Sequence, residues 1–348
     1  MPTRPRSVAR SRSRRRPRDR HGCASRSNRP CVAARAIAAR PRRALQLERG
    51  VQLLTDSSYP RWKHRGMDAT ANPTPFFTVA ERLVLDAPDD DWDLVLGDGP
   101  IVATAIHDGH AMRPSLAAHL AVDDTGRRRE EDPLTGALVE AGDVRLRVRA
   151  SRFQVDLNRP RDLALSTDPA DTWGLKVWKG PLPPGELATS LAAHDRFYAM
   201  MAELMDRLIA RWGCVLLLDI HSYNHRRDGA GAPPAPSGDN PDIDVGATTL
   251  DRSRWGHAVE RLVQVLRERP AAGRTLDVRE NVRYDGGGHF PEWLHAAYGD
   301  KVCAVSLEYK KFYMDEWTAR ADIAVLEDLR RGLAAAVDAV RGEFHACR

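Results

Sequence analysis

The sequence predicts an α/β protein with three layers, in which helices cover both faces of a mixed, mostly parallel central sheet. Two observations predict this fold class. Short apolar runs of strand length are bounded by Gly- and Asp-rich turns, and amphipathic segments with helical periodicity lie between these runs. Strand and helix patterns that alternate in this way are typical of a sheet buried on both faces.

Four segments are predicted strands. "IVATAIH" (101–107) is apolar and β-branched, with "GDGP" before it and "DGH" after it, and "VRLRVRA" (144–150) alternates strictly. "CVLLLDI" (214–220) is a fully apolar run that ends in an aspartate, and "KVCAVSLEYKKF" (301–312) contains another apolar strand. The alternating strand should have one solvent-facing side, whereas the others should be buried.

Three segments are predicted helices. The first runs from about Leu187 to Trp212, with Gly213 placed to end it. An amphipathic helix is expected over 254–269, and the chain closes on a helix from about Asp322 to Phe344. Residues 224–246 are rich in Gly, Pro and Asp, which predicts a long loop of the kind that is often functional.

Residues 1–66 are predicted to be a disordered tail that precedes a single domain over 76–346. Residues 1–50 hold 16 Arg and two acidic residues, a charge of +14, so the remainder of this +5 chain carries −9. Such a tail has too little apolar content to fold. It is interpreted as a polyanion-binding arm, as an organellar transit segment, or as untranslated sequence before a true start at Met67. The acidic body argues against nucleic-acid binding as the main function.

The cysteines and the hydropathy favour a soluble cytoplasmic protein. No apolar run approaches the roughly 20 residues that span a bilayer. The five cysteines are odd in number and contain no CxxC pair, which argues against a disulfide framework and a Cys-ligated zinc site. Cys214 and Cys303 lie in apolar runs and are predicted to be small buried hydrophobes.

Polar side chains end three of the predicted strands. His107 ends the first, with His110 close behind it; His221 ends the third, after Asp219; and Glu308 ends the last. Ligands of open α/β sheets bind at the carboxyl ends of the strands. Two histidines and carboxylates at one edge are the composition that zinc hydrolases use, so the sequence predicts a metal site there.

The segment "VDLNRPR" (155–161) places Asn158, Arg159 and Arg161 together. Arginine is suited to binding a carboxylate through two parallel N–H bonds, so this segment is a candidate for recognising a substrate carboxylate. The alternative interpretation is an arginine cluster on the surface.

Six ordered segments between about residues 97 and 320 resemble the N-formylglutamate amidohydrolase (deformylase) family. This family is part of the zinc-carboxypeptidase-like superfamily, so the resemblance implies a zinc-exopeptidase or phosphorylase/hydrolase-like fold. The segments are "AIHDGH", "VDLNRPR", "LLLDIHSY", "PDIDVG", "DGGGHFPEWLHAAYG" and "SLEYKKFYMDE".

The resemblance implies a role for several of these residues. His107 and His221 are expected to bind one zinc ion, and Glu308 to act as the general base. Arg159, with Asn158, is expected to hold the substrate carboxylate, and Asp219 to orient His221.

Two assignments remain open at this point. The third metal ligand is His110, preferred for its proximity, or alternatively Glu131 or Asp132. His289 either contacts the substrate or is a loop histidine bonded to backbone. The opening motif "IHDGH" also departs from the family pattern, which indicates a divergent member.

The expected activity is hydrolysis of the amide of an N-formyl or N-acyl amino acid that bears a carboxylate, as in N-formylglutamate. A zinc carboxypeptidase and a succinylglutamate or aspartate deacylase are alternatives within the same superfamily. An inactive protein that has kept the fold, and a polyanion-binding protein that acts through the Arg tail, are alternatives from other classes. The oligomeric state is not predicted.

Overall fold

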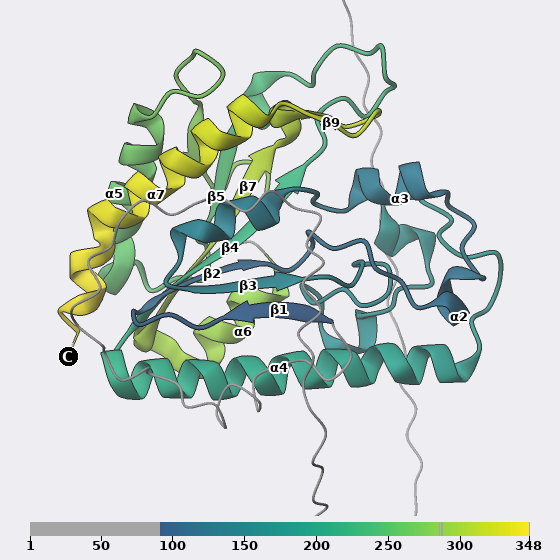
Figure 1. Cartoon of the computed structure of the whole chain (residues 1–348), viewed down its shortest axis with the longest axis horizontal. Helices are drawn as coiled ribbons and strands as arrows, with labels where there is room; N and C mark the ends of the chain where they lie inside the picture. The colour runs from purple at the N-terminus through teal and green to yellow at the C-terminus, as the bar shows by residue number, and fades with distance from the viewer. Residues whose placement is uncertain (1–90, 285, 287, 348) are drawn as a thin grey trace, which may run out of the picture. The chain divides into compact units, whose positions relative to one another are not determined.

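The computed structural model describes residues 91–347, except 285 and 287 (Figure 1). The predicted tail, its proposed boundary at Met67 and the start of the predicted domain at residue 76 lie outside the described residues.

A mixed seven-stranded sheet forms the centre of the described chain, in the order β1-β3-β2-β4-β7-β5-β6. The neighbouring strands β3, β2, β4 and β7 are parallel, whereas β1 pairs antiparallel with β3 and β5 antiparallel with β7. The predicted mixed, mostly parallel sheet is therefore confirmed. The strands are β1 (Trp92–Val95), β2 (Ile101–Ala105), β3 (Val144–Val148), β4 (Val215–Tyr223), β5 (Ile243–Gly246), β6 (Val278–Glu280) and β7 (Val302–Lys310), and β8 (Met314–Asp315) pairs with β9 (Arg320–Ala321) in a small second sheet.

Helices cover both faces of the sheet and complete the predicted three layers (Figure 1). On one face lie α4 (Pro184–Trp212) and α6 (His289–Tyr298), and on the other lie α5 (Arg252–Glu268) and α7 (Ile323–His345). The remaining helical segments are short: α2 (Pro114–Ala117), α3 (Asp124–Glu130), and the 3-10 turns η1 (Thr135–Ala141), η2 (Arg161–Leu163), η3 (Pro169–Thr172), η4 (Ser237–Asp239), η5 (Gly299–Lys301) and η6 (Lys311–Tyr313).

The alternation of side chains along β4 decides which layer the functional residues face. Leu216 and Leu218 pack in the core beneath α5 and α7, and Val215 and Leu217 pack in the core beneath α4. Successive side chains of a strand point to opposite faces, so His221 continues the series of Val215 and Leu217. The polar end of β4 therefore lies on the α4 side of the sheet.

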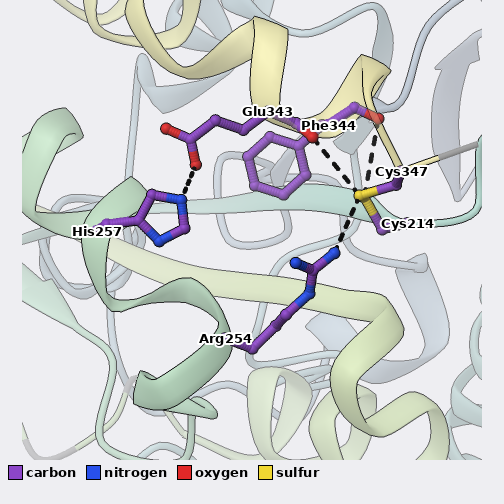
Figure 2. Close-up of a disulfide and its surroundings, with 6 residues drawn as sticks. All are labelled: Cys214, Arg254, His257, Glu343, Phe344 and Cys347. Atoms are coloured by element: carbon purple, nitrogen blue, oxygen red, sulfur yellow. Dashed lines mark hydrogen bonds and ion pairs between the residues drawn. A yellow bond between two sulfur atoms is a disulfide. The ribbon is translucent and has the colours of Figure 1, made fainter.

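A disulfide joins Cys214, immediately before β4, to Cys347 after the end of α7, as Figure 2 shows. The prediction that Cys214 is an unpaired buried residue is wrong, because the fold brings together two positions 133 residues apart. The guanidinium of Arg254 donates a hydrogen bond to the Cys347 sulfur at 3.4 Å. Cys303 is buried and free, as predicted. The cysteines therefore no longer support the prediction of a cytoplasmic protein.

Five short strands differ from the prediction. Four of them, β1, β6, β8 and β9, were not predicted, and β5 lies inside the segment predicted to be a loop. In the described part of the chain, no helix combines the length and apolar character that crossing a membrane requires.

Candidate metal centre

The carboxyl ends of β2, β4 and β7 bring three of the predicted residues together. His107 follows β2, and His221 lies near the end of β4, which pairs with β2. Their ring centroids are 4.8 Å apart. In the parallel pairing of β4 with β7, His221 is registered with Glu308. The structure therefore gathers these side chains at the edge where the sequence predicted a site.

Asp132 completes this group from a different element. It lies just after α3, and its backbone N–H donates to the carbonyl of His107 at 2.9 Å, which holds the segment over the end of β2. Its Oδ2 is 3.0 Å from Nδ1 of His221 and 3.5 Å from Nδ1 of His107. All three side chains are buried, and they offer ligand atoms within 4.8 Å of one another. We call His107, Asp132 and His221 the His–Asp–His cluster.

Two further carboxylates set the tautomers of both imidazoles. Nε2 of His107 lies 2.8 Å from Asp156, and Nε2 of His221 lies 2.8 Å from Asp219. An ionised carboxylate only accepts hydrogen bonds, so each Nε2 carries the proton and donates it. A ring that carries only this proton has its lone pair on Nδ1, facing Asp132, whereas a ring that is also protonated at Nδ1, as the raised pKa of His221 favours, donates to Asp132. The predicted contact between Asp219 and His221 is present.

Nδ1 of His107 is buried and has no hydrogen-bond partner among the described residues. Buried polar atoms are nearly always paired, so an orphaned imidazole lone pair beside a carboxylate requires an explanation. A divalent cation held by two imidazole nitrogens and one carboxylate oxygen fits this donor set, with one tetrahedral position left for water or substrate.

The charges of the cluster depend on one another. Burial alone would raise the pKa of Asp132, but its hydrogen bond to His221 and the nearby imidazole of His107 outweigh burial and hold that pKa well below its usual range. Burial alone would lower the pKa of His221, but the carboxylates of Asp219 and Asp132 raise it well above its usual value. The site is thus arranged to hold an anion beside a positive charge.

The pKa of the Glu308 carboxyl is shifted in the opposite direction from that of Asp132. Burial raises the pKa of its carboxyl to about 7, and the charge of Asp132 adds to this increase while His221 opposes it. Within the described residues, no hydrogen bond or ion pair holds this carboxylate. A carboxyl group with a pKa near 7 is suited to accept and release a proton.

A cavity of about 300 Å³ opens beside the cluster. Its lining includes Arg152, Lys311 and Trp173, which are not among the residues predicted from the sequence. Lys311 is buried and donates to the carbonyls of Arg129 and Glu131 and to Oδ1 of Asn224. The lining residues are His107, Glu130, Asp132, Arg152, Asn158, Trp173, His221, Ser222, Tyr223, Asn224, Arg227, Tyr284, Gly288, Glu308 and Lys311.

The two other candidates for the third ligand lie outside the cluster. Nδ1 of His110 lies 2.8 Å from Glu131, and one third of the His110 side chain is exposed. Glu131 is fully buried and also accepts hydrogen bonds from Arg127 and Ser151. The structure therefore places Asp132, and not the preferred His110, against the two histidines.

The predicted arginines lie away from the cavity. Arg159 lines a smaller cavity next to it and donates to the carbonyl of Asp171. Arg161 forms a two-pronged ion pair with Asp195, and about half of its side chain is exposed. His289 is not among the lining residues and lies against Tyr198, with 5.7 Å between the ring centroids.

Asn158 does line the cavity, as predicted, and explains one glycine of the "DGGGH" segment. Its Oδ1 accepts from the backbone N–H of Phe290 at 2.9 Å. A Cβ at Gly288 would lie 2.7 Å from the Asn158 amide, and Gly288 has a φ of 97°. Only glycine combines this backbone conformation with this close approach.

Asp156 could have been selected from the sequence, because it lies in the candidate substrate segment "VDLNRPR", two residues before Asn158. Its pairing with His107, 49 residues earlier, is visible only in the structure. For Arg152, Trp173 and Lys311 no signal was recognised, because their selection depends on which loops line the cavity.

These features define a three-layer α/β/α protein with a polar cavity at the carboxyl edge of its sheet, the place where proteins of this class bind their ligands. The chain belongs to the N-formylglutamate amidohydrolase family, whose model matches residues 99–314. This confirms the predicted family and identifies the protein as a hydrolase that acts on amide bonds.

Solved structures agree with the fold. The N-formylglutamate amidohydrolase from Ralstonia eutropha JMP134 is 22% identical, with a TM-score of 0.53, over 73% of this chain and 99% of that chain. A gene product from Agrobacterium tumefaciens is 17% identical, with a TM-score of 0.50, over 72% of this chain and 96% of that chain. No curated protein sequence matches the chain.

Proposed function

We propose that this protein is a metal-dependent amidohydrolase that removes the formyl or another acyl group from an N-acyl amino acid. The observation that carries this proposal is the orphaned Nδ1 of His107, which lies with Nδ1 of His221 and Oδ2 of Asp132 in one buried group beside a cavity. Membership of the amidohydrolase family supports the reaction type.

His107, His221 and Asp132 would hold the ion, which we take to be zinc because imidazole and carboxylate ligands in a three-residue set suit it. Bound there, zinc supplies a Lewis acid for the amide carbonyl and makes water nucleophilic near neutral pH. Asp156 and Asp219 hold the proton of each ring on Nε2, so that Nδ1 is the ring atom that would bind the ion.

Glu308 is the proposed general base and acid. Its carboxylate takes the proton of the attacking water, and the same proton then passes to the amide nitrogen as the C–N bond breaks. The products are the free amino acid and the carboxylate of the acyl group. A buried carboxyl with a pKa of about 7 suits both steps.

Arg152 replaces Arg159 as the proposed partner of the substrate carboxylate. Arg152 lines the cavity, and its Nη2 donates to Oδ2 of Asp156 at 2.8 Å, which fixes the guanidinium close to His107. A cation held in this way can bind a carboxylate without reorganising. Asn158, in the same cavity, supports the bound substrate.

The test is to measure metal content and hydrolysis of N-formyl amino acids for the wild type, His221→Ala and Glu308→Gln, all purified without chelator. We expect His221→Ala to lose its metal and its activity. Glu308→Gln should keep its metal while kcat falls by roughly 10²- to 10⁴-fold, because only proton transfer is removed. Glu260→Gln, an exposed position on α5, is the matched control and should change neither quantity.

Wild-type protein that carries no metal, or a Glu308→Gln variant with wild-type kcat, would contradict the mechanism. Including N-succinyl amino acids and dipeptides among the substrates separates a formyl hydrolase from a succinyl deacylase and from a carboxypeptidase, because each acts on an acyl group of different size.

A further inference from the structure

Trp173 occupies an unusual position for a large apolar residue. It lies at the end of η3, lines the cavity of the His–Asp–His cluster and also the smaller cavity beside it, and is 48% exposed. A tryptophan usually buries most of its ring area, because that burial is its main contribution to stability. Packing in the core therefore does not account for this side chain.

The backbone of Trp173 is strained as well. Its φ is 53°, in the left-handed region that non-glycine residues rarely adopt. The turn is held by hydrogen bonds from Gly174 N–H to the carbonyl of Pro169 and from Leu175 N–H to the carbonyl of Thr172, both 2.8 Å. Non-glycine residues held in this conformation gather at ligand-binding sites, where the surrounding structure maintains the strain.

Arg152 connects Trp173 to the cluster. The guanidinium carbon of Arg152 lies over the Trp173 ring, 4.8 Å from its centroid. The same guanidinium donates to Asp156, which in turn accepts from His107. The indole is therefore fixed to the group that positions the imidazole of His107, and it lines the cavity together with the aromatic rings of Tyr223 and Tyr284.

We propose that Trp173 determines substrate specificity by packing against the side chain of the amino acid, and that the preferred substrates are N-acyl amino acids with an aromatic or large apolar side chain. The proposal rests on the function proposed above. The α-carboxylate and the side chain of an amino acid diverge from the same carbon, so a substrate whose carboxylate is on Arg152 places its side chain next to the adjoining indole.

The test compares kcat/KM for N-formyl-L-phenylalanine, N-formyl-L-glutamate and N-formylglycine in the wild type, Trp173→Phe, Trp173→Ala and Trp173→Gly. We expect the wild type to prefer the phenylalanine derivative over both others. In Trp173→Ala and Trp173→Gly, kcat/KM for N-formyl-L-phenylalanine should fall by roughly 10- to 100-fold, as expected for the loss of one aromatic contact. For N-formylglycine, which has no side chain, kcat/KM should change less than about 2-fold in these variants. Trp173→Phe should retain most of the preference for N-formyl-L-phenylalanine.

The control is Leu187→Ala, which removes an exposed apolar side chain outside the cavity lining. It should leave kcat/KM unchanged for all three substrates. Trp173→Gly removes the left-handed strain, so its melting temperature and metal content verify that any loss is not caused by misfolding. Equal losses on all three substrates, or a wild-type preference for N-formyl-L-glutamate, would overturn the proposal.

Binding measurements keep this proposal separable from the reaction. Calorimetry on Glu308→Gln should show that N-formyl-L-phenylalanine binds more tightly than N-formyl-L-glutamate and N-formylglycine. This difference should disappear when Trp173→Ala is added, because it depends on the indole. If the wild type hydrolyses none of the compounds but this binding preference is present, the proposed reaction fails and the specificity role stands. If the binding preference is absent, the role of Trp173 fails.

Discussion

At the scale of single residues, the candidate site is a chain of carboxylates and imidazoles in alternation. Asp156 and Asp219 accept from the Nε2 atoms, and Asp132 lies between the two Nδ1 atoms. Of these three buried carboxylates only Asp156 is paired with a guanidinium, that of Arg152, so Asp132 and Asp219 leave an excess of negative charge, which is costly in a protein interior. A divalent cation at the Nδ1 atoms would neutralise this excess and give the lone pair of His107 a partner.

This arrangement predicts that Asp132, and not His110, is the third ligand. Asp132→Asn keeps the shape of the side chain but removes its charge, so we expect the affinity for zinc to fall by at least about 10²-fold. His110→Gln should bind zinc within a few-fold of the wild type, because His110 bonds to Glu131 outside the cluster. Competition with a calibrated chelator measures both affinities. Loss of metal in His110→Gln with retention in Asp132→Asn would restore the assignment preferred from the sequence.

At the scale of elements, the predicted segments are those whose own residues specify them. The strands at 101–107, 144–150, 214–220 and 301–312 and the three long helices have clear apolar patterns, and they form at these positions. β5 has four residues in a Gly- and Pro-rich segment and depends on pairing with β7 and on Asp244, which accepts hydrogen bonds from the backbone of residues 282–284. Such long-range partners are not visible in local periodicity.

The same reasoning explains which parts of the site were predicted. His107, His221 and Glu308 lie at the ends of the neighbouring parallel strands β2, β4 and β7, so topology alone brings them together. The proposed third ligand and the proposed substrate arginine depend on how α3 and the segment after β3 fold back over the sheet. Spacing therefore favoured His110 and Arg159, whereas the structure places Asp132 and Arg152 at the cavity.

The disulfide between β4 and α7 gives a prediction at this scale. It closes a loop of 133 residues and ties the last helix to the central strand, so it limits the freedom of the unfolded chain. We expect Cys347→Ser to lower the free energy of unfolding by about 3 kcal/mol. Urea denaturation with and without dithiothreitol measures this difference. The reductant should destabilise the wild type by a similar amount and leave Cys347→Ser unchanged; an equal response in both would show that the bond does not form in solution.

At the scale of the whole molecule, Asn224 and Arg227 at the start of the long loop after β4 line the cavity, and Glu316 fixes the start of this loop. Its carboxylate accepts hydrogen bonds from the backbone N–H groups of His225 and Arg226, both at 2.8 Å. The next residue, Arg227, lines the cavity and lies 3.5 Å from Glu130. The turn between β8 and β9 is thus connected to the wall of the site through one buried carboxylate.

This connection predicts that stability falls in acid. Burial alone would raise the pKa of Glu316 above its ordinary value of 4.5, but the hydrogen bonds of His225 and Arg226 outweigh burial and lower it to about 2. A carboxyl whose pKa is lowered in the folded state contributes stability that is present above pH 4.5 and is lost as the pH falls towards 2. This carboxylate contributes at most about 3 kcal/mol to the free energy of unfolding, because a tenfold change in a protonation equilibrium corresponds to roughly 1.4 kcal/mol.

Glu316→Gln separates this contribution from the other acidic groups of the protein. We expect the variant to be less stable than the wild type at pH 7, because the oxygen of a neutral amide accepts a hydrogen bond from a backbone N–H more weakly than a carboxylate oxygen does. In addition, the NH₂ group of the amide cannot accept a hydrogen bond, so one of the two backbone N–H groups of His225 and Arg226 loses its acceptor. As the pH falls from 4.5 to 2, the two free energies of unfolding should converge, since the wild-type carboxylate becomes protonated while the amide does not change. Guanidinium denaturation at a series of pH values measures both curves. Curves that stay parallel over this range would mean that Glu316 carries no lowered pKa, and that other contacts hold the start of the loop.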